Sequence, residues 1–206
     1  MSLLNELTIT LIFTRLLGFL VIVGVHGFAL AGLLRLMGDP TAQYTGRLTP
    51  NPAPHTPILA VATAVLIEMF WINPIKVRPE NLRWGRWSLV LAAFGALLAT
   101  LAVVPVLLSL HQLVIAFAPR NLALPTINTL QQVSDLAIWF VALNWLPLPL
   151  MTGSLFAYAF WPQLQRSYTR NQGLFTGVLA VAMIAGLLDP FIRPVHALLA
   201  GWLRGG

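Results

Sequence analysis

Long apolar stretches alternate along the chain with short polar segments that contain proline. Three stretches carry no Asp, Glu, Lys or Arg, and they cover 16–34, 88–119 and 136–165. Each is long enough, or nearly so, to cross the hydrocarbon core of a bilayer, which takes about 20 apolar residues in a helix. Two shorter apolar stretches follow the same pattern, at 57–72 and 172–188. The pattern predicts an all-α integral membrane protein with about five transmembrane helices joined by short extramembrane hairpins.

The ends of these helices follow from the breaker residues between them. The predicted helices cover 7–37, 57–72, 88–118, 132–160 and 172–188, with a short interfacial helix over 191–203. Gly38-Asp39-Pro40 should stop the first helix, and Pro105 should kink the third. Residues 119–131 are expected to form a polar loop. No internal repeat is visible, so we expect one membrane domain over 1–206.

Composition supports a lipid-facing surface. Apolar residues make up 58% of the chain and charged residues only 9%, whereas a soluble domain carries about a quarter charged residues. The net charge of +6 does not indicate nucleic-acid binding, because the basic residues lie in the connections, where lipid headgroups attract them. The chain has no cysteine, which excludes disulfides and thiolate metal ligands. Membrane lipids are the expected surroundings.

The basic residues also predict an orientation. The connections at 73–87 and 161–171 hold six Lys and Arg residues. With five spans, both connections share one side with the N-terminus. The positive-inside rule then puts the N-terminus in the cytoplasm. We expect the bacterial inner membrane as the location.

Several motifs occur in order between residues 20 and 160. The first is His26-Gly27-Phe28-Ala29-Leu30, and G-D-P-T-A at 38–42 and G-R-L-T-P-N-P at 46–52 come next. A basic N-P-I-K-V-R-P-E-N-L-R segment covers 73–83, and L-N-W-L-P-L-P-L-M-T-G-S covers 143–154. Together they resemble the site-2 protease family of intramembrane zinc metallopeptidases. The resemblance implies a protease-like core over about 7–160, with the C-terminal helix and interfacial segment at 172–204 outside it.

The resemblance also shows which catalytic groups are missing. In the family, an H-E-x-x-H helix supplies two zinc ligands and a general base, and an aspartate after the Pro-rich segment is the third ligand. Here His26 keeps the first ligand position, but Gly27 replaces the glutamate, Leu30 the second histidine and Thr152 the aspartate. The degenerate site therefore comprises His26, Gly27, Leu30, Asn144 and Thr152. We expect no zinc, no catalysis, and His26 as a hydrogen-bonded buried histidine. The family's polar Ser-Asn pair corresponds to Leu98 and Ala99.

A retained scaffold without reactive groups points to a binding role. We expect an accessory, structural or assembly subunit of a larger membrane complex, whose partners are transmembrane helices of other proteins. Its contact surface would include Trp145, Leu148, Met151 and Gly153, together with small positions such as Gly27.

Two alternatives stay open. One is a divergent active metalloprotease, which would need His26, His111, Glu68 or Asp135 to converge. The other is a membrane protein that binds a lipid or a pigment, with His111 as the ligand. The simpler interpretation of Glu68 is that it either snorkels to the membrane surface or pairs with Arg15, and that of Asp135 is a residue near a helix start, where it complements the helix dipole.

Overall fold

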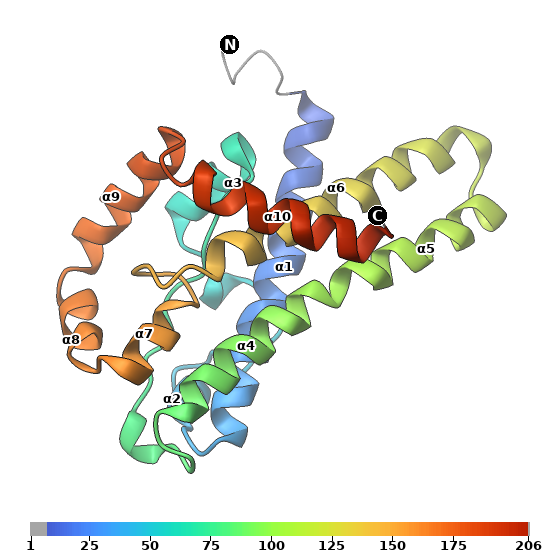
Figure 1. Cartoon of the computed structure of the whole chain (residues 1–206). Helices are drawn as coiled ribbons and strands as arrows, with labels where there is room; N and C mark the ends of the chain where they lie inside the picture. Colours follow the sequence, from blue (N-terminus) through green and yellow to red (C-terminus); the bar gives the residue numbers. More distant parts are fainter. Residues whose placement is uncertain (1–7, 206) are drawn as a thin grey trace.

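The chain forms a bundle of helices around one long central helix, and the computed structural model describes residues 8–205 (Figure 1). Within that range no strand occurs. The α-helices are α1 (Ile9–Leu36), α2 (Thr41–Tyr44), α3 (Ile58–Ile67), α4 (Trp87–Leu101), α5 (Val103–Phe117), α6 (Arg120–Asn144), α7 (Ser154–Phe160), α8 (Gln163–Arg170), α9 (Gln172–Ile184) and α10 (Asp189–Arg204). Two 3₁₀ turns, η2 (Ala53–His55) and η3 (Pro79–Asn81), lie in the connections.

Helix α1 is the centre of the bundle and packs against α4 and α6. The hydroxyl of Thr8 caps its N-terminus by accepting from the N–H of Leu11 at 3.2 Å. The predicted start at Leu7 lies outside the described residues. The predicted stop is confirmed, because Gly38 has a φ of 112° that ends the helix before Pro40.

The third predicted helix is confirmed as the nearly continuous pair α4 and α5, which together cover 31 residues. The pair breaks at Ala102, three residues before Pro105. Proline lacks the N–H that would bond the carbonyl four residues earlier, so the break lies where the sequence predicts a kink.

The predicted polar loop at 119–131 is wrong, because α6 begins at Arg120 directly after Pro119. Its first half forms a long hairpin with α5 that projects from the bundle (Figure 1). The hydroxyls of Thr126 and Thr129 bond carbonyls four residues earlier in the same helix. The polar residues that suggested a loop at 119–131 therefore lie on an exposed helix. Asp135 accordingly lies well inside α6 and not near a helix start, which corrects that expectation.

The helices support a membrane protein, with fewer continuous spans than the five expected. Ile9–Leu36 and Trp87–Phe117 are long and apolar enough to cross a bilayer, and α9 with α10 passes the same test only as a pair bent by 72°. Helix α3 has 10 residues, about 15 Å at 1.5 Å per residue. After it, Glu68 takes a left-handed φ of 61°, and the chain continues without regular structure to residue 78.

This non-helical return changes the end of α1 at which the basic connections lie. The N–H of Arg83 bonds the carbonyl of Met37 at 2.9 Å, and the side chain of Gln165 bonds the carbonyl of Val77 at 2.9 Å. Both basic connections therefore lie at the C-terminal end of α1, away from Thr8. The sequence-based assignment of these connections to the side of the N-terminus is wrong. It counted the second predicted helix as one full crossing of the membrane. In the structure, α3 leads away from the C-terminal end of α1, and residues 69–78 return to that same end.

Candidate functional site

The degenerate site is centred on His26, which α1 holds in the interior of the bundle with no exposed surface. Its Nδ1 lies 2.8 Å from the hydroxyl of Thr100 on α4, and its Nε2 lies 2.7 Å from the hydroxyl of Thr152. Phe140 of α6 packs edge-on against the ring, with centroids 4.8 Å apart. The prediction that His26 is a hydrogen-bonded buried histidine is confirmed.

The hydrogen bonds around His26 specify the positions of its protons. The Thr100 hydroxyl donates to the carbonyl of Ala96 at 2.9 Å, so its oxygen accepts from the Nδ1–H of His26. The lone pair of a neutral imidazole is then on Nε2, and Thr152 donates to it. Every polar atom of the ring has a partner, and no charge is required.

Asn144 positions Thr152. Its side-chain amide donates to the carbonyls of Phe70 and Phe140 at 3.0 Å each, while its own side-chain oxygen accepts from the N–H of Thr152 at 3.4 Å. The carbonyl of Asn144 accepts from the N–H of Gly153 at 2.7 Å. Asn144 thus closes the Pro-rich break between α6 and α7 and directs Thr152 toward α1.

The expected contact surface around this break is divided between the interior and the outside. Trp145 is 44% exposed, and Leu148 is partly buried against the core. Met151 is 2% exposed and Gly153 is buried. A side chain at Gly153 would overlap the carbonyls of residues 145 and 146, so this glycine serves a close approach within the chain itself.

His55 is the site residue that sequence reasoning missed. A Cβ added at Gly27 would overlap the imidazole of His55, so this ring fills the room left at Gly27. The ring is fully buried, its Nε2 lies 3.1 Å from the carbonyl of Thr49, and burial lowers the pKa of the imidazole. Its Nδ1 has no hydrogen-bond partner among residues 8–205. A lone histidine in a Pro-rich loop gave no periodic signal to find it.

Thr100 was also missed. The Ser-Asn pair was matched to Leu98 and Ala99, but Leu98 is 48% exposed on the outer face of α4. Thr100 follows four residues after Ala96 and therefore shares the buried face with it. A polar group toward His26 is therefore retained, one or two positions away from the matched pair.

The residues present do not fit the zinc ion that the family resemblance implies. Leu30 is an apolar side chain with 3% exposure, and a neutral threonine hydroxyl is not among the usual zinc ligands. The Nε2 lone pair of His26, which a metal would need, already accepts from Thr152. Across residues 8–205 there is no group of three or more His, Cys, Asp and Glu arranged to hold a metal.

The residues required by the divergent-protease alternative do not converge on His26. Glu68 pairs with Arg15, one of the two outcomes that the simpler interpretation allowed, and the guanidinium of Arg15 also donates to the carbonyl of Val65. Asp135 accepts from His196 and Arg204 of α10. His111 lies on α5 facing a separate pocket that includes Asp135.

A pocket of about 330 Å³ opens beside Thr152. Its walls come from the extended segment 72–78, the loop and helix start at 150–158, and α8 with its neighbours. Leu30 and Thr152, which the family resemblance matches to two zinc-ligand positions, lie on its inner wall, and Tyr168 and Gln165 of α8 lie on another. The degenerate site is thus adjacent to a cavity, although its own polar groups are paired with each other.

Comparison of the chain with protein-family models, with curated proteins and with solved structures gave no match.

Proposed function

We propose that this chain is a non-catalytic, site-2-protease-like membrane protein that acts as an accessory, structural or assembly subunit of a larger membrane complex. The observation that carries the proposal is the closed hydrogen-bond network of His26, Thr100 and Thr152. The groups that correspond to a metal site now hold two helices and a loop together. The part of this region that can still bind a partner is therefore the adjacent pocket.

The pocket suits an apolar segment of a partner. Leu30, Met151 and Leu155 make its inner wall largely apolar around Thr152, while Gln165 and Tyr168 of α8 bring polar groups to another wall. Lys76 and Arg78 of the extended segment add two charged side chains to the lining. A transmembrane segment of another protein offers apolar side chains at regular spacing, and packing at close range drives association in lipid. Trp145, 44% exposed at the Pro-rich break, adds an aromatic contact outside the pocket.

A metal-free hydrolase is the strongest enzymatic rival. Thr152 Oγ1 lies 2.7 Å from the Nε2 of His26, which is the distance expected between a nucleophile and its base. The third member, Thr100, is a neutral hydroxyl, and it offers no charge to stabilise an imidazolium. The ring is fully buried, so protonating it to an imidazolium would place an unpaired charge in the interior, which costs on the order of several kcal/mol. A structural role for the network is therefore favoured.

The orientation that we propose reverses the one expected from the sequence. The connections at 73–87 and 161–171, with six Lys and Arg, lie at the C-terminal end of α1, and Arg35 is in its last turn. By the positive-inside rule this end faces the cytoplasm, so the N-terminus lies on the opposite side, in a bacterial inner membrane.

Site-specific photocrosslinking in native membranes tests the subunit role. A photoreactive residue at Tyr168, inside the pocket, should give a protein adduct of defined mass. The same residue at Leu174, which is 66% exposed on α9 and outside the pocket, is the matched control and should not give that adduct. Absence of any adduct at Tyr168, together with a lone monomer in gentle native extraction, would contradict the proposal.

Activity is tested separately. Incubation of the purified chain with single-span membrane substrates should give no cleavage, and Thr152→Val should change nothing in that assay. Cleavage that a chelator blocks would support the metalloprotease alternative, and cleavage lost only in Thr152→Val would support the hydrolase. A visible absorption band in the purified protein, lost in His111→Phe, would support the pigment alternative.

A further inference from the structure

A second pocket, of about 640 Å³, lies toward the other end of α6. Its lining comes from α5, α6 and the C-terminal end of α10, and consists of Leu108, His111, Asn128, Gln131, Gln132, Asp135 and Arg204. Asp135 precedes Asn144 by nine residues, about 14 Å along the helix. Six of its seven lining residues carry polar or charged side chains, although both flanking helices, α5 and α10, are rich in apolar residues, so this clustering needs an explanation.

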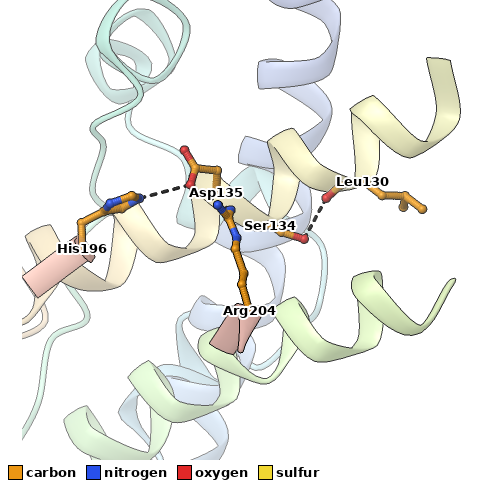
Figure 2. Close-up of polar contacts among 5 residues, drawn as sticks. All are labelled: Leu130, Ser134, Asp135, His196 and Arg204. Carbon is orange, nitrogen blue, oxygen red and sulfur yellow. Dashed lines mark hydrogen bonds and ion pairs between the residues drawn. The ribbon is translucent and has the colours of Figure 1, made fainter. Parts of the chain in front are cut away.

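Asp135 is held so that only one of its oxygens is used. Oδ1 accepts from the Nε2 of His196 at 3.2 Å and from the guanidinium of Arg204 at 2.9 Å. His196 is fixed in turn by stacking on Trp139, with centroids 4.0 Å apart. Figure 2 shows the second oxygen directed away from both partners. No described residue donates to it, and the side chain is 33% exposed. The pocket thus presents an unused anionic acceptor.

The rest of the lining presents polar groups that have no partner within the protein. The Nε2 atom of His111 is buried and has no hydrogen-bond partner among residues 8–205, and an unpaired buried polar atom costs about 1–3 kcal/mol. The side chains of Asn128, Gln131 and Gln132 form no hydrogen bond with another described residue. Arg204, which already donates to Asp135, adds a positive charge to this lining. A ligand that fills the pocket would satisfy the orphaned nitrogen.

The pocket lies at the depth of lipid headgroups. A Cβ at Gly18 would touch Val133 and Leu136, so this part of α6 is level with the N-terminal third of α1. The charge-free stretch of α1 covers 16–34, about as long as the hydrocarbon core is thick, and Gly18 lies two residues inside its start. That level is therefore close to the edge of the core.

Helix α10 marks the same level. Its inner face packs on the core through Ile192 and its neighbours. Phe191, Leu198 and Trp202 form an outward stripe, 63% to 75% exposed. They are seven and four residues apart and share one side of the helix. An amphipathic helix with an apolar stripe and a tryptophan is typical of the membrane interface.

We propose that this pocket binds a phosphoethanolamine headgroup, as part of a phosphatidylethanolamine molecule in the membrane. The primary ammonium donates to the free oxygen of Asp135, and the phosphate accepts from Arg204, His111 and the amides. The lipid is favoured over a soluble phosphoethanolamine because the apolar stripe of α10 and the depth of the pocket place acyl chains beside it. This inference is independent of the proposed subunit function.

The test is lipid retention by the full-length protein, measured by native mass spectrometry after titration with single phospholipids. The wild type should retain phosphatidylethanolamine about tenfold better than phosphatidylcholine, whose ammonium has no N–H, and phosphatidylglycerol, which has no ammonium; tenfold corresponds to about 1.4 kcal/mol. Soluble glycerophosphoethanolamine should compete weakly. Equal retention of the three lipids would overturn the proposal, and equally strong competition by the soluble compound would overturn its assignment to the membrane lipid.

Three variants distinguish recognition from folding. Asp135→Asn should abolish the preference for phosphatidylethanolamine. His111→Phe removes no hydrogen bond of the protein, so it should reduce retention about tenfold while the melting temperature stays unchanged or rises. Arg193→Gln is the matched control, because Arg193 pairs with Asp189 on the exposed side of the same helix and should leave retention unaltered. A His111→Phe protein that melts normally and retains the lipid like the wild type would contradict the proposal, even if Asp135→Asn fails to fold.

Discussion

The imidazole of His55 fills the space beside Gly27 that a side chain on α1 would otherwise need. In the family that this chain resembles, a glutamate occupies that position of the helix. No hollow lies beside Gly27 here, because a fully buried ring from η2 occupies that space. The two residues are thus coupled sterically, and neither can be changed without regard to the other.

The first prediction follows from this coupling. Gly27→Ala should destabilise the protein by about 1–3 kcal/mol, the usual cost of overpacking a core. His55→Ala should cost a comparable amount through the cavity that it leaves. The double variant should be more stable than the sum of the two changes predicts, because each removes the cause of the other's strain. Thermal unfolding of the four proteins in one detergent forms the cycle, and simple additivity would contradict the coupling.

The second prediction concerns the network around His26. Thr152→Val keeps the shape of the side chain but leaves the Nε2 of a fully buried imidazole without its donor. We expect a loss of about 1–3 kcal/mol of unfolding free energy. Thr152→Ser keeps the hydroxyl and should cost clearly less. Equal losses in the two variants would mean that the methyl group, and not the hydrogen bond, stabilises this contact.

The third prediction is that purified protein contains zinc well below one atom per chain by elemental analysis. The reason is the donor set, in which Leu30 and Thr152 stand where the family resemblance would place two zinc ligands. Restoring the chemistry through Leu30→His with Thr152→Asp gives three ligands with His26, the number that a catalytic zinc site needs. This double variant should bind more zinc than the wild type. Stoichiometric zinc in the wild type that is lost on His26→Ala would refute the prediction.

Helix ends and ion pairs were predictable from the sequence where one or two residues determine them. Gly38 with Pro40 ended α1 as predicted, and the pair of Arg15 with Glu68 followed from two charges in apolar surroundings. Pro105 marked the break before α5, because proline lacks the N–H that would continue the helix there. In each case the cause is local in the chain or is a charge that needs a partner in lipid.

The remaining features depend on distant parts of the chain. The role of His55 comes from its packing on Gly27, 28 positions earlier, and no periodicity indicates such a contact. The first half of α6 looks like a polar loop because its exposed face is polar, although the backbone is helical. The position of the basic connections relative to α1 was missed because hydropathy does not show that residues 69–78 lead the chain back without crossing as a helix.

The fourth prediction concerns Asp39, which is 1% exposed and ties the end of α1 to the connection at 78–83. Burial alone would raise the pKa of its carboxyl. Hydrogen bonds from the hydroxyl and N–H of Thr41, the N–H of Arg78 and the amide of Asn81 outweigh this effect and lower the pKa below its ordinary value. The ionised form therefore stabilises the fold above the pKa of the unfolded chain. That contribution is lost as the pH falls through the folded pKa.

Melting curves of the wild type and Asp39→Asn between neutral and acidic pH measure this contribution. The variant should be less stable at pH 7 by about 1.5–3 kcal/mol, typical of hydrogen bonds to a charged group. The difference should shrink once the pH falls below about 4, where an ordinary aspartate is protonated. Glu80→Gln, which changes an exposed carboxylate in the same connection, should leave stability at pH 7 unaltered. A difference that is constant with pH would mean that Asp39 acts only through its shape.

The last prediction compares Gly153 with Gly177, which differ in the atoms that a Cβ at each position would meet. A Cβ at Gly153 would overlap the carbonyls of Trp145 and Leu146, which are backbone atoms and cannot turn aside as a side chain can. Gly153→Ala should therefore open the Pro-rich break, release Thr152 from His26, and lower stability more than Gly27→Ala does. Gly177 of α9 has nothing within 4 Å of the same hypothetical atom. Gly177→Ala should leave stability unchanged or raise it by about 0.5–1 kcal/mol, because alanine favours a helix interior over glycine. If both substitutions have the same effect on the melting temperature, the close approach at Gly153 is not what holds the break in place.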